Sequence, residues 1–151
     1  PAGRYSADGC DVRASTTSAR PWFLRANLRQ YDYFDGTLTA YGGGIVLAPT
    51  SALRFDLGVS RNDVELPVGD VVADIWSLRL TWAISPLMTT NALIQYNSLA
   101  EDFLTNIRFN FIHTPGSDLF LVFTDDRGVD GDQWALADQG LVAKLTYLVR
   151  F

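Results

Sequence analysis

Apolar and polar residues alternate along most of the chain. At its end, Leu141, Ala143, Leu145, Tyr147, Val149 and Phe151 share one parity, and Lys144 and Arg150 fall on the other. A period of two is that of a β-strand whose two faces differ in polarity. A half-buried strand in a soluble sandwich has the same period, so the alternation alone leaves a soluble sheet open.

The same pattern recurs upstream between turn residues. It predicts strands at Pro21–Asp32, Thr37–Leu47, Ala52–Arg61, Ala73–Ile84, Met88–Asn97, Asp102–His113 and Ser117–Thr124, with Asp11–Thr17 as a weak additional candidate. Because no useful helical period is present, the predicted fold class is all-β. We expect an antiparallel meander of about eight strands over residues 21–151, preceded by a polar leader or weak extra strand at residues 1–20.

The predicted connections differ in length. Those at Pro49, Pro86 and Pro115 are short, whereas Asn62–Val72 and Asp125–Gln139 read as long acidic loops. Short turns at one end and longer loops at the other are typical of outer-membrane β-barrels. The alternation therefore favours a transmembrane barrel, closed or the C-terminal part of a larger one.

Amino-acid composition and charge exclude some classes of protein and partner. The chain has 151 residues and 48% hydrophobic content, yet no apolar run reaches the roughly 18 to 20 residues of a membrane-spanning helix. A net charge of -5 argues against nucleic acid as a partner. The chain begins at Pro1 and shows no signal peptide, so we expect a processed product or a fragment.

Strand parity assigns side chains to the two sides of the predicted barrel. The expected lumen-lining charged residues are Arg25, Arg29, Arg54, Asp56, Arg79, Arg108, Lys144 and Arg150, with Asp56 as the single acid. Such an excess of cations requires water or acidic partners, and it fits poorly in a closed eight-stranded barrel, whose interior is filled by side chains. Gly42–Gly44 marks a bend or a place where bulky lumen residues need room.

Aromatic residues cluster near the predicted strand ends. Trp22, Trp76, Trp82, Tyr96 and Phe111 are expected at the membrane interfaces. Tyr147, Val149 and Phe151 form the alternating aromatic ending that resembles the C-terminal signal read by the outer-membrane assembly machinery.

Four stretches carry a resemblance to a known family. They are Leu66–Asp70, Ala92–Ser98, Asn106–Phe123 and Lys144–Phe151. Together they resemble the C-terminal β-barrel region of uncharacterised bacterial outer-membrane proteins, in which the barrel follows a carbohydrate-binding-like domain. The resemblance implies a barrel in the outer membrane and further strands upstream of Pro1, and it supplies no catalytic residues.

Two functions remain open. The first is a passive or gated pore whose basic lumen passes small anionic solutes, and the second is a non-conducting membrane anchor for a surface or periplasmic domain. Expected partners are outer-membrane lipid, lipopolysaccharide, the assembly machinery and upstream parts of the same protein. We expect no cofactor and no metal site. Enzymatic activity is also not expected, because His113 has the parity of Phe109 and Phe111, away from the serines of the opposite face.

Overall fold

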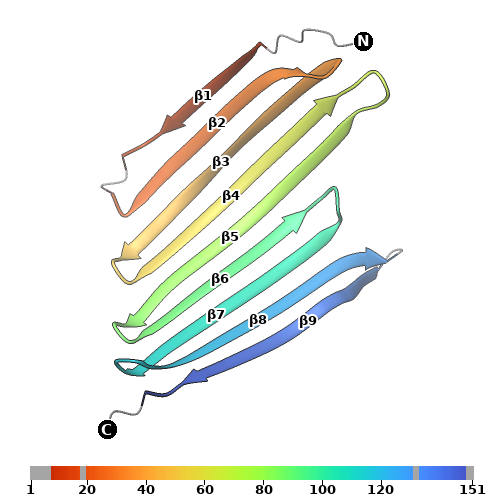
Figure 1. The fold of residues 1–151 in the computed structure, drawn as a ribbon. Coiled ribbons are helices and arrows are strands. Elements are labelled where there is room, and N and C mark those ends of the chain that lie inside the picture. The colour runs from red at the N-terminus through yellow and green to blue at the C-terminus, as the bar shows by residue number, and fades with distance from the viewer. Residues whose placement is uncertain (1–7, 18–19, 131–132, 149–151) are drawn as a thin grey trace.

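The computed structural model describes residues 8–17, 20–130 and 133–148, and it forms one antiparallel sheet (Figure 1). The nine strands are β1 Gly9–Ser15, β2 Trp22–Tyr33, β3 Gly36–Thr50, β4 Leu53–Glu65, β5 Val71–Ser85, β6 Met88–Asn97, β7 Asp102–Thr114, β8 Ser117–Asp130 and β9 Gln133–Thr146. The predicted all-β antiparallel meander is confirmed.

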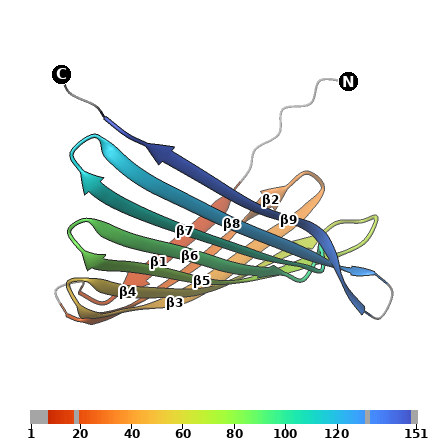
Figure 2. The same ribbon diagram turned by 90° about the horizontal axis from the view of Figure 1, so that it is seen from below.

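Each strand pairs with its neighbours in sequence, in the order β1 to β9. The sheet is curved and twisted, and its edge strands β1 and β9 do not pair with each other (Figures 1 and 2). The sheet is therefore not closed.

The predicted strands match the observed ones most closely where turns are tight. Strand β6 has the predicted bounds, and the weak candidate near the N-terminus is strand β1. The two long acidic loops were predicted wrongly. Strand β4 continues to Glu65 and β8 continues to Asp130, since their residues pair in register with β3 and with β9.

The two ends of the sheet differ in chemistry. At the acidic end, Phe34–Asp35, Leu66–Asp70 and Ser98–Glu101 connect the strands. At the proline-turn end, Ser51–Ala52, Pro86–Leu87 and Pro115–Gly116 make two-residue turns. Gly116 has a φ of 88°, a conformation that glycine adopts without a steric penalty.

The sheet is a single layer. Among the described residues, Val46 is the one hydrophobic side chain that is fully buried, at 1% exposure. A water-soluble domain normally packs a second layer of helices or strands against its apolar face. Here the described residues contain no helix, and so none that could cross a membrane.

Candidate functional site: the two faces of the sheet

Strand register assigns each side chain to one of two faces. Paired residues point to the same side of a sheet, and residues two apart on a strand do so as well. We call the face that carries Arg25, Asp56 and Arg108 the polar face, and the face that carries Leu57, Trp76 and Ile107 the apolar face.

The register brings the predicted lumen-lining residues of the described chain to one side. The polar face carries Arg25, Arg29, Arg54, Asp56, Arg79, Arg108 and Lys144. Arg150 lies outside the described residues.

The expectation that Asp56 is the single acid on this face is wrong. The polar face also carries Asp11, Asp102, Asp118, Asp126 and Asp138. Asp126 and Asp138 lie in a segment that the sequence predicts as a loop, but β8 and β9 extend far enough to include them. Asp126 on β8 and Asp138 on β9 are direct cross-strand partners. These two acids therefore lie together toward the acidic end of the sheet.

A charged cluster spans β2 to β4 on the polar face. Arg25 donates hydrogen bonds of 2.5 and 3.2 Å to the two carboxylate oxygens of Asp56, whose side chain is only 16% exposed. Arg54 lies 3.8 Å from the same carboxylate and places its guanidinium 5.5 Å from the centre of the Phe23 ring. One partly buried acid thus balances two arginines.

Glycines make room for this cluster. A Cβ on Gly44 would lie 3.0 Å from Nε of Arg25 and 2.6 Å from the carbonyl oxygen of Leu57. The prediction that the glycine run leaves space for bulky polar side chains is confirmed at Gly44, because Arg25 lies across β3 at this position.

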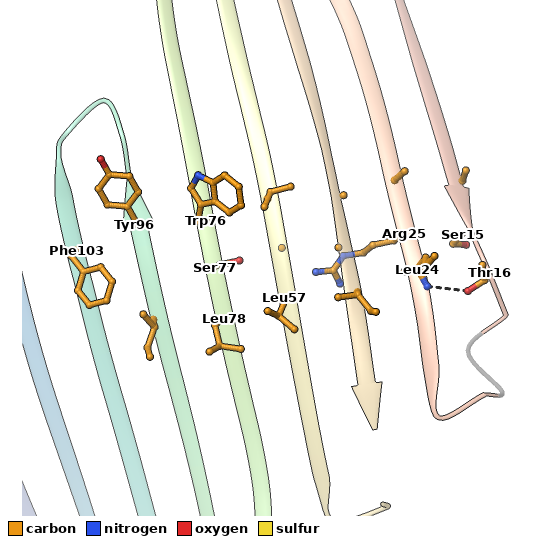
Figure 3. A pocket seen from close by; sticks show the side chains of 18 residues that line it. Ser15, Thr16, Leu24, Arg25, Leu57, Trp76, Ser77, Leu78, Tyr96 and Phe103 are labelled. Atoms are coloured by element: carbon orange, nitrogen blue, oxygen red, sulfur yellow. Dashed lines mark hydrogen bonds between the residues drawn. The ribbon is translucent and has the colours of Figure 1, made fainter. Parts of the chain in front are cut away.

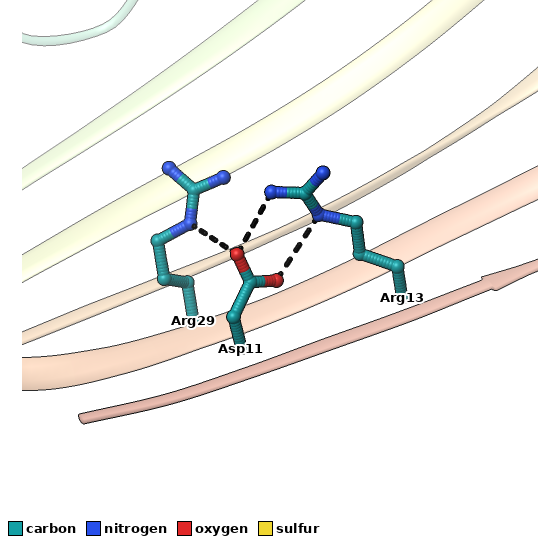
Figure 4. Close-up of polar contacts among 3 residues, drawn as sticks. All are labelled: Asp11, Arg13 and Arg29. Atoms are coloured by element: carbon teal, nitrogen blue, oxygen red, sulfur yellow. Dashed lines mark hydrogen bonds and ion pairs between the residues drawn. The ribbon is translucent and has the colours of Figure 1, made fainter.

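A second cluster lies at the β1 edge (Figure 4). Arg13 donates to both carboxylate oxygens of Asp11 at 3.1 and 2.8 Å, and Arg29 reaches the same carboxylate at 3.3 Å. All three side chains are exposed, so this cluster contributes little to stability.

The remaining polar-face cations have different environments. Nε of Arg108 donates to Asn106 at 2.9 Å, and Asn106 donates in turn to Thr124 at 2.9 Å. Arg79 is opposite Asp56 in the register, yet it makes no ion pair within the described part of the chain. The charge of Arg79 is therefore not balanced by a direct contact there.

The apolar face carries a continuous hydrophobic band. One cross-strand row consists of Trp22, Leu47, Phe55, Leu80, Ala92, Ile107, Phe123 and Leu141. The predicted interfacial residues Trp22, Trp76, Trp82, Tyr96 and Phe111 all lie on this face.

Aromatic rings and ion pairs bound the band toward the acidic end. Trp76, Tyr96 and Phe103 are successive neighbours across β5, β6 and β7, and Trp134 packs edge-on against Tyr96 and Phe103 at 6.1 and 6.4 Å between ring centres. Arg61 and Asp74 follow in the next row, 3.6 Å apart.

Another ion pair on this face was not predicted from the sequence. Arg127 donates to Asp125 at 2.8 Å, and Asp125 is only 7% exposed. Its second carboxylate oxygen has no hydrogen-bond partner among the described residues. The sequence did contain a signal for this ion pair. Asp125 and Arg127 are two residues apart on an alternating segment, which places both charges on one face.

The apolar face is hollowed where small residues lie side by side (Figure 3). Ala14, Ala26 and Gly43 occupy one row, and Leu24, Leu57 and Trp76 line the same depression of about 840 Å³. Most of the residues that line it are apolar, and Ser15, Thr16, Arg25 and Ser77 are among the polar ones.

The predicted C-terminal signal is described only in part. Tyr147 follows β9 and is exposed, while Val149 and Phe151 lie outside the described residues. The backbone N–H of Leu148 donates to the buried Ser117 hydroxyl at 3.0 Å, which fixes this segment beside the turn between β7 and β8.

The described residues contain no group of three or more His, Cys, Asp and Glu side chains suited to a metal ion. His113 is exposed and has the Phe111 ring 6.3 Å away.

Comparison with known proteins adds no identification: no family model, no curated protein and no solved structure matches this chain.

Proposed function

We propose that this chain forms part of an integral outer-membrane β-barrel whose polar face lines a pore for small anionic solutes. The observation that carries the proposal is the difference between the faces of a single-layer sheet. One face has a band of Leu, Ile, Val and aromatic side chains, and the other has charged and amide side chains.

The dimensions of the band support a membrane-spanning role. On β5 its apolar positions run from Trp76 to Ile84, and on β7 they run from Phe103 to Phe111. A transmembrane strand needs about 9 to 11 residues when tilted by about 45°, which matches both stretches. Aromatic residues at the band edges are typical of the interface with lipid headgroups.

A water-soluble role would leave this band without cover. Leu57, Trp76 and Ile107 are each between 39% and 57% exposed, although they lie inside the sheet and away from its edges. Soluble monomers rarely expose an apolar patch of such extent. Lipid would cover this face along its whole length.

The polar face supports solute passage. Arg54 and Arg108 lie in one cross-strand row near the middle of the sheet, and Arg79 lies in the next row. Arg79 has no ion pair within the described residues. A cation without a direct ion pair requires hydration, so this part of the face would be wet. Rings of positive side chains favour anions in pores.

A non-conducting anchor is the second candidate. It is favoured by the pairing of Arg25 and Arg54 with Asp56, and of Arg13 and Arg29 with Asp11, because such contacts neutralise charge across β1 to β4. In this role the barrel would hold a surface or periplasmic domain in the membrane. Both candidates include lipopolysaccharide and the assembly machinery as partners.

Conductance in planar lipid bilayers separates the two functions. For a pore, we expect anion-selective channels, and the double change Arg79→Ser and Arg108→Ser should roughly halve the anion preference. Arg61→Ser is the control for loss of a cation elsewhere, because it removes one positive charge from the apolar face. Absence of conductance from protein that inserts correctly would favour the anchor.

A further inference from the structure

The two edge strands run in the same direction. Strands alternate in direction through an antiparallel meander, so β1 and β9, the first and ninth, are parallel to each other. Figure 1 shows both arrows pointing the same way. Direct closure of this sheet would therefore require a parallel β1–β9 pair, whereas bacterial single-chain barrels have an even number of antiparallel strands.

Strand β9 has the properties of a strand that lacks a neighbour. Leu141 and Leu145 on the apolar face are 72% and 76% exposed, and Val142 on the polar face is 61% exposed. The strand covers Gln133–Thr146 and contains no proline. Natural edge strands are usually short, charged or interrupted to prevent pairing. A long apolar edge such as this one is suited to a further strand.

Strand β1 offers a second unpaired edge. Its register with β2 runs from Gly9 opposite Tyr31 to Ser15 opposite Arg25, and all its residues are exposed. The backbone N–H of Thr16 also donates to the Leu24 carbonyl at 3.0 Å. These bonds fix the direction of β1, and hence the direction that its other neighbour must take.

We infer that the gap between β9 and β1 is filled by an odd number of antiparallel strands from the same polypeptide. One or three such strands, for example, give an even total, and every pair in the resulting barrel is antiparallel.

A second copy of this chain does not fit the gap. Pairing of β9 with its own symmetry mate is antiparallel, so the acidic end of the second copy would lie on the opposite side of the membrane. Head-to-tail pairing of β9 with β1 of another copy is parallel. This step rests on the proposed membrane function, because only a membrane forbids the inverted copy.

Changing the strand number by one tests the inference directly. A copy of β4 residues 53–64, joined ahead of Gly9 by an Asn-Gly turn, gives ten strands, and a copy of the β3–β4 hairpin, residues 36–64, gives eleven. Ending the copy at Val64 pairs that residue with Gly9 on the polar face, so Leu53 and Phe55 of the copy lie on the apolar face. Closed barrels resist detergent until heated and migrate faster on gels. We expect the fast band from the ten-stranded chain alone. A fast band from the unmodified chain, or from eleven strands without ten, would overturn the inference.

Cross-linking keeps the test decisive if the added strands do not fold. Cys10 on β1 is the single cysteine, and it is exposed. Three separate variants of the otherwise unmodified chain carry Gln139→Cys, Ala143→Cys or Leu145→Cys. Each adds one thiol to β9, on the apolar face that also carries Cys10. We expect no intramolecular disulfide and full maleimide labelling of Cys10. An intramolecular disulfide would show that β1 and β9 pair directly.

The role of a second copy is tested separately. With Cys10→Ser and Ala143→Cys, efficient disulfide-linked dimers in lipid vesicles would show β9–β9 pairing and overturn the inference, whereas monomers support it. A different result would contradict the proposed function. If the ten-stranded chain shows the heat-dependent gel shift but does not insert into vesicles, the membrane role is wrong, whereas the inference about strand number still holds.

Discussion

Arg25 on β2 reaches across β3 and binds both carboxylate oxygens of Asp56 on β4, passing over Gly44, where no side chain intervenes. The contact joins two strands that are not neighbours in the sheet. It combines a charge-assisted bidentate geometry with partial burial of the acid, conditions under which an ion pair is stronger than at an open surface.

Gly44→Ala should break this contact. The new Cβ would collide with the Leu57 carbonyl oxygen and with the Arg25 side chain, so we expect a loss of about 1 to 3 kcal/mol in the free energy of unfolding in detergent. Gly43→Ala is the control, because its Cβ approaches only the Arg25 carbonyl oxygen, at 3.3 Å, on the other face. Equal losses in urea titrations of the two variants would contradict the role of Gly44.

Asp56→Asn should increase anion selectivity. The change removes the acid that balances Arg25 and Arg54, and leaves both guanidinium groups to attract anions. We expect the anion-to-cation permeability ratio, measured from reversal potentials in a salt gradient, to rise by roughly a factor of two. Asp63→Asn removes an acid from the apolar face and should leave the ratio unchanged. A fall in the ratio of the Asp56 variant would disprove the assignment of the polar face to the pore.

A charge on the apolar face should prevent stable insertion. Ala92→Arg places a guanidinium in the middle of the hydrophobic band, and we expect it to reduce stability in lipid by about 2 to 4 kcal/mol. Thr89→Arg on the same strand points to the polar face and should cost less than half as much. Folding titrations in lipid vesicles measure both changes. Equal costs for the two variants would argue against a lipid-facing band.

The buried acid on β8 depends on its partner. Arg127→Leu leaves Asp125 without its ion pair, and we expect a loss of about 1 to 3 kcal/mol, the cost of an unpaired buried polar group. Adding Asp125→Asn removes the charge and should restore most of that loss. Chemical unfolding of both variants gives the comparison, and a double variant less stable than Arg127→Leu would exclude this explanation.

Removal of Phe151 should reduce membrane insertion without affecting synthesis, as expected if the last residues act as an assembly signal. The measurement is the fraction of protein in the outer-membrane pellet. Phe34→Asn is the control, since it removes an exposed aromatic side chain at the β2–β3 turn and suits the positive φ of that position. Equal insertion of all three proteins would remove the basis for this signal.

The sequence predicts strands well where alternation is strict and turns are tight, as for β6. It failed at Asn62–Glu65 and Asp125–Asp130, where acidic residues have low strand propensity but pair with residues already ordered in β3 and β9. The alternation along each strand is enough to place Arg25, Arg54, Arg79 and Arg108 on one face. The face of a side chain depends on its position along its own strand and not on which residues lie opposite. The bidentate contact of Arg25 with Asp56 could not be predicted, since it depends on the register of three strands.

The meander order of the strands has a consequence for folding. Every strand finds its partner in the segment that immediately precedes or follows it, so each pairing closes a short loop of chain. Sequence-local contacts are the ones that form fastest in β-proteins. The sheet can therefore grow one hairpin at a time, and each strand that pairs presents its free edge to the next strand of the chain.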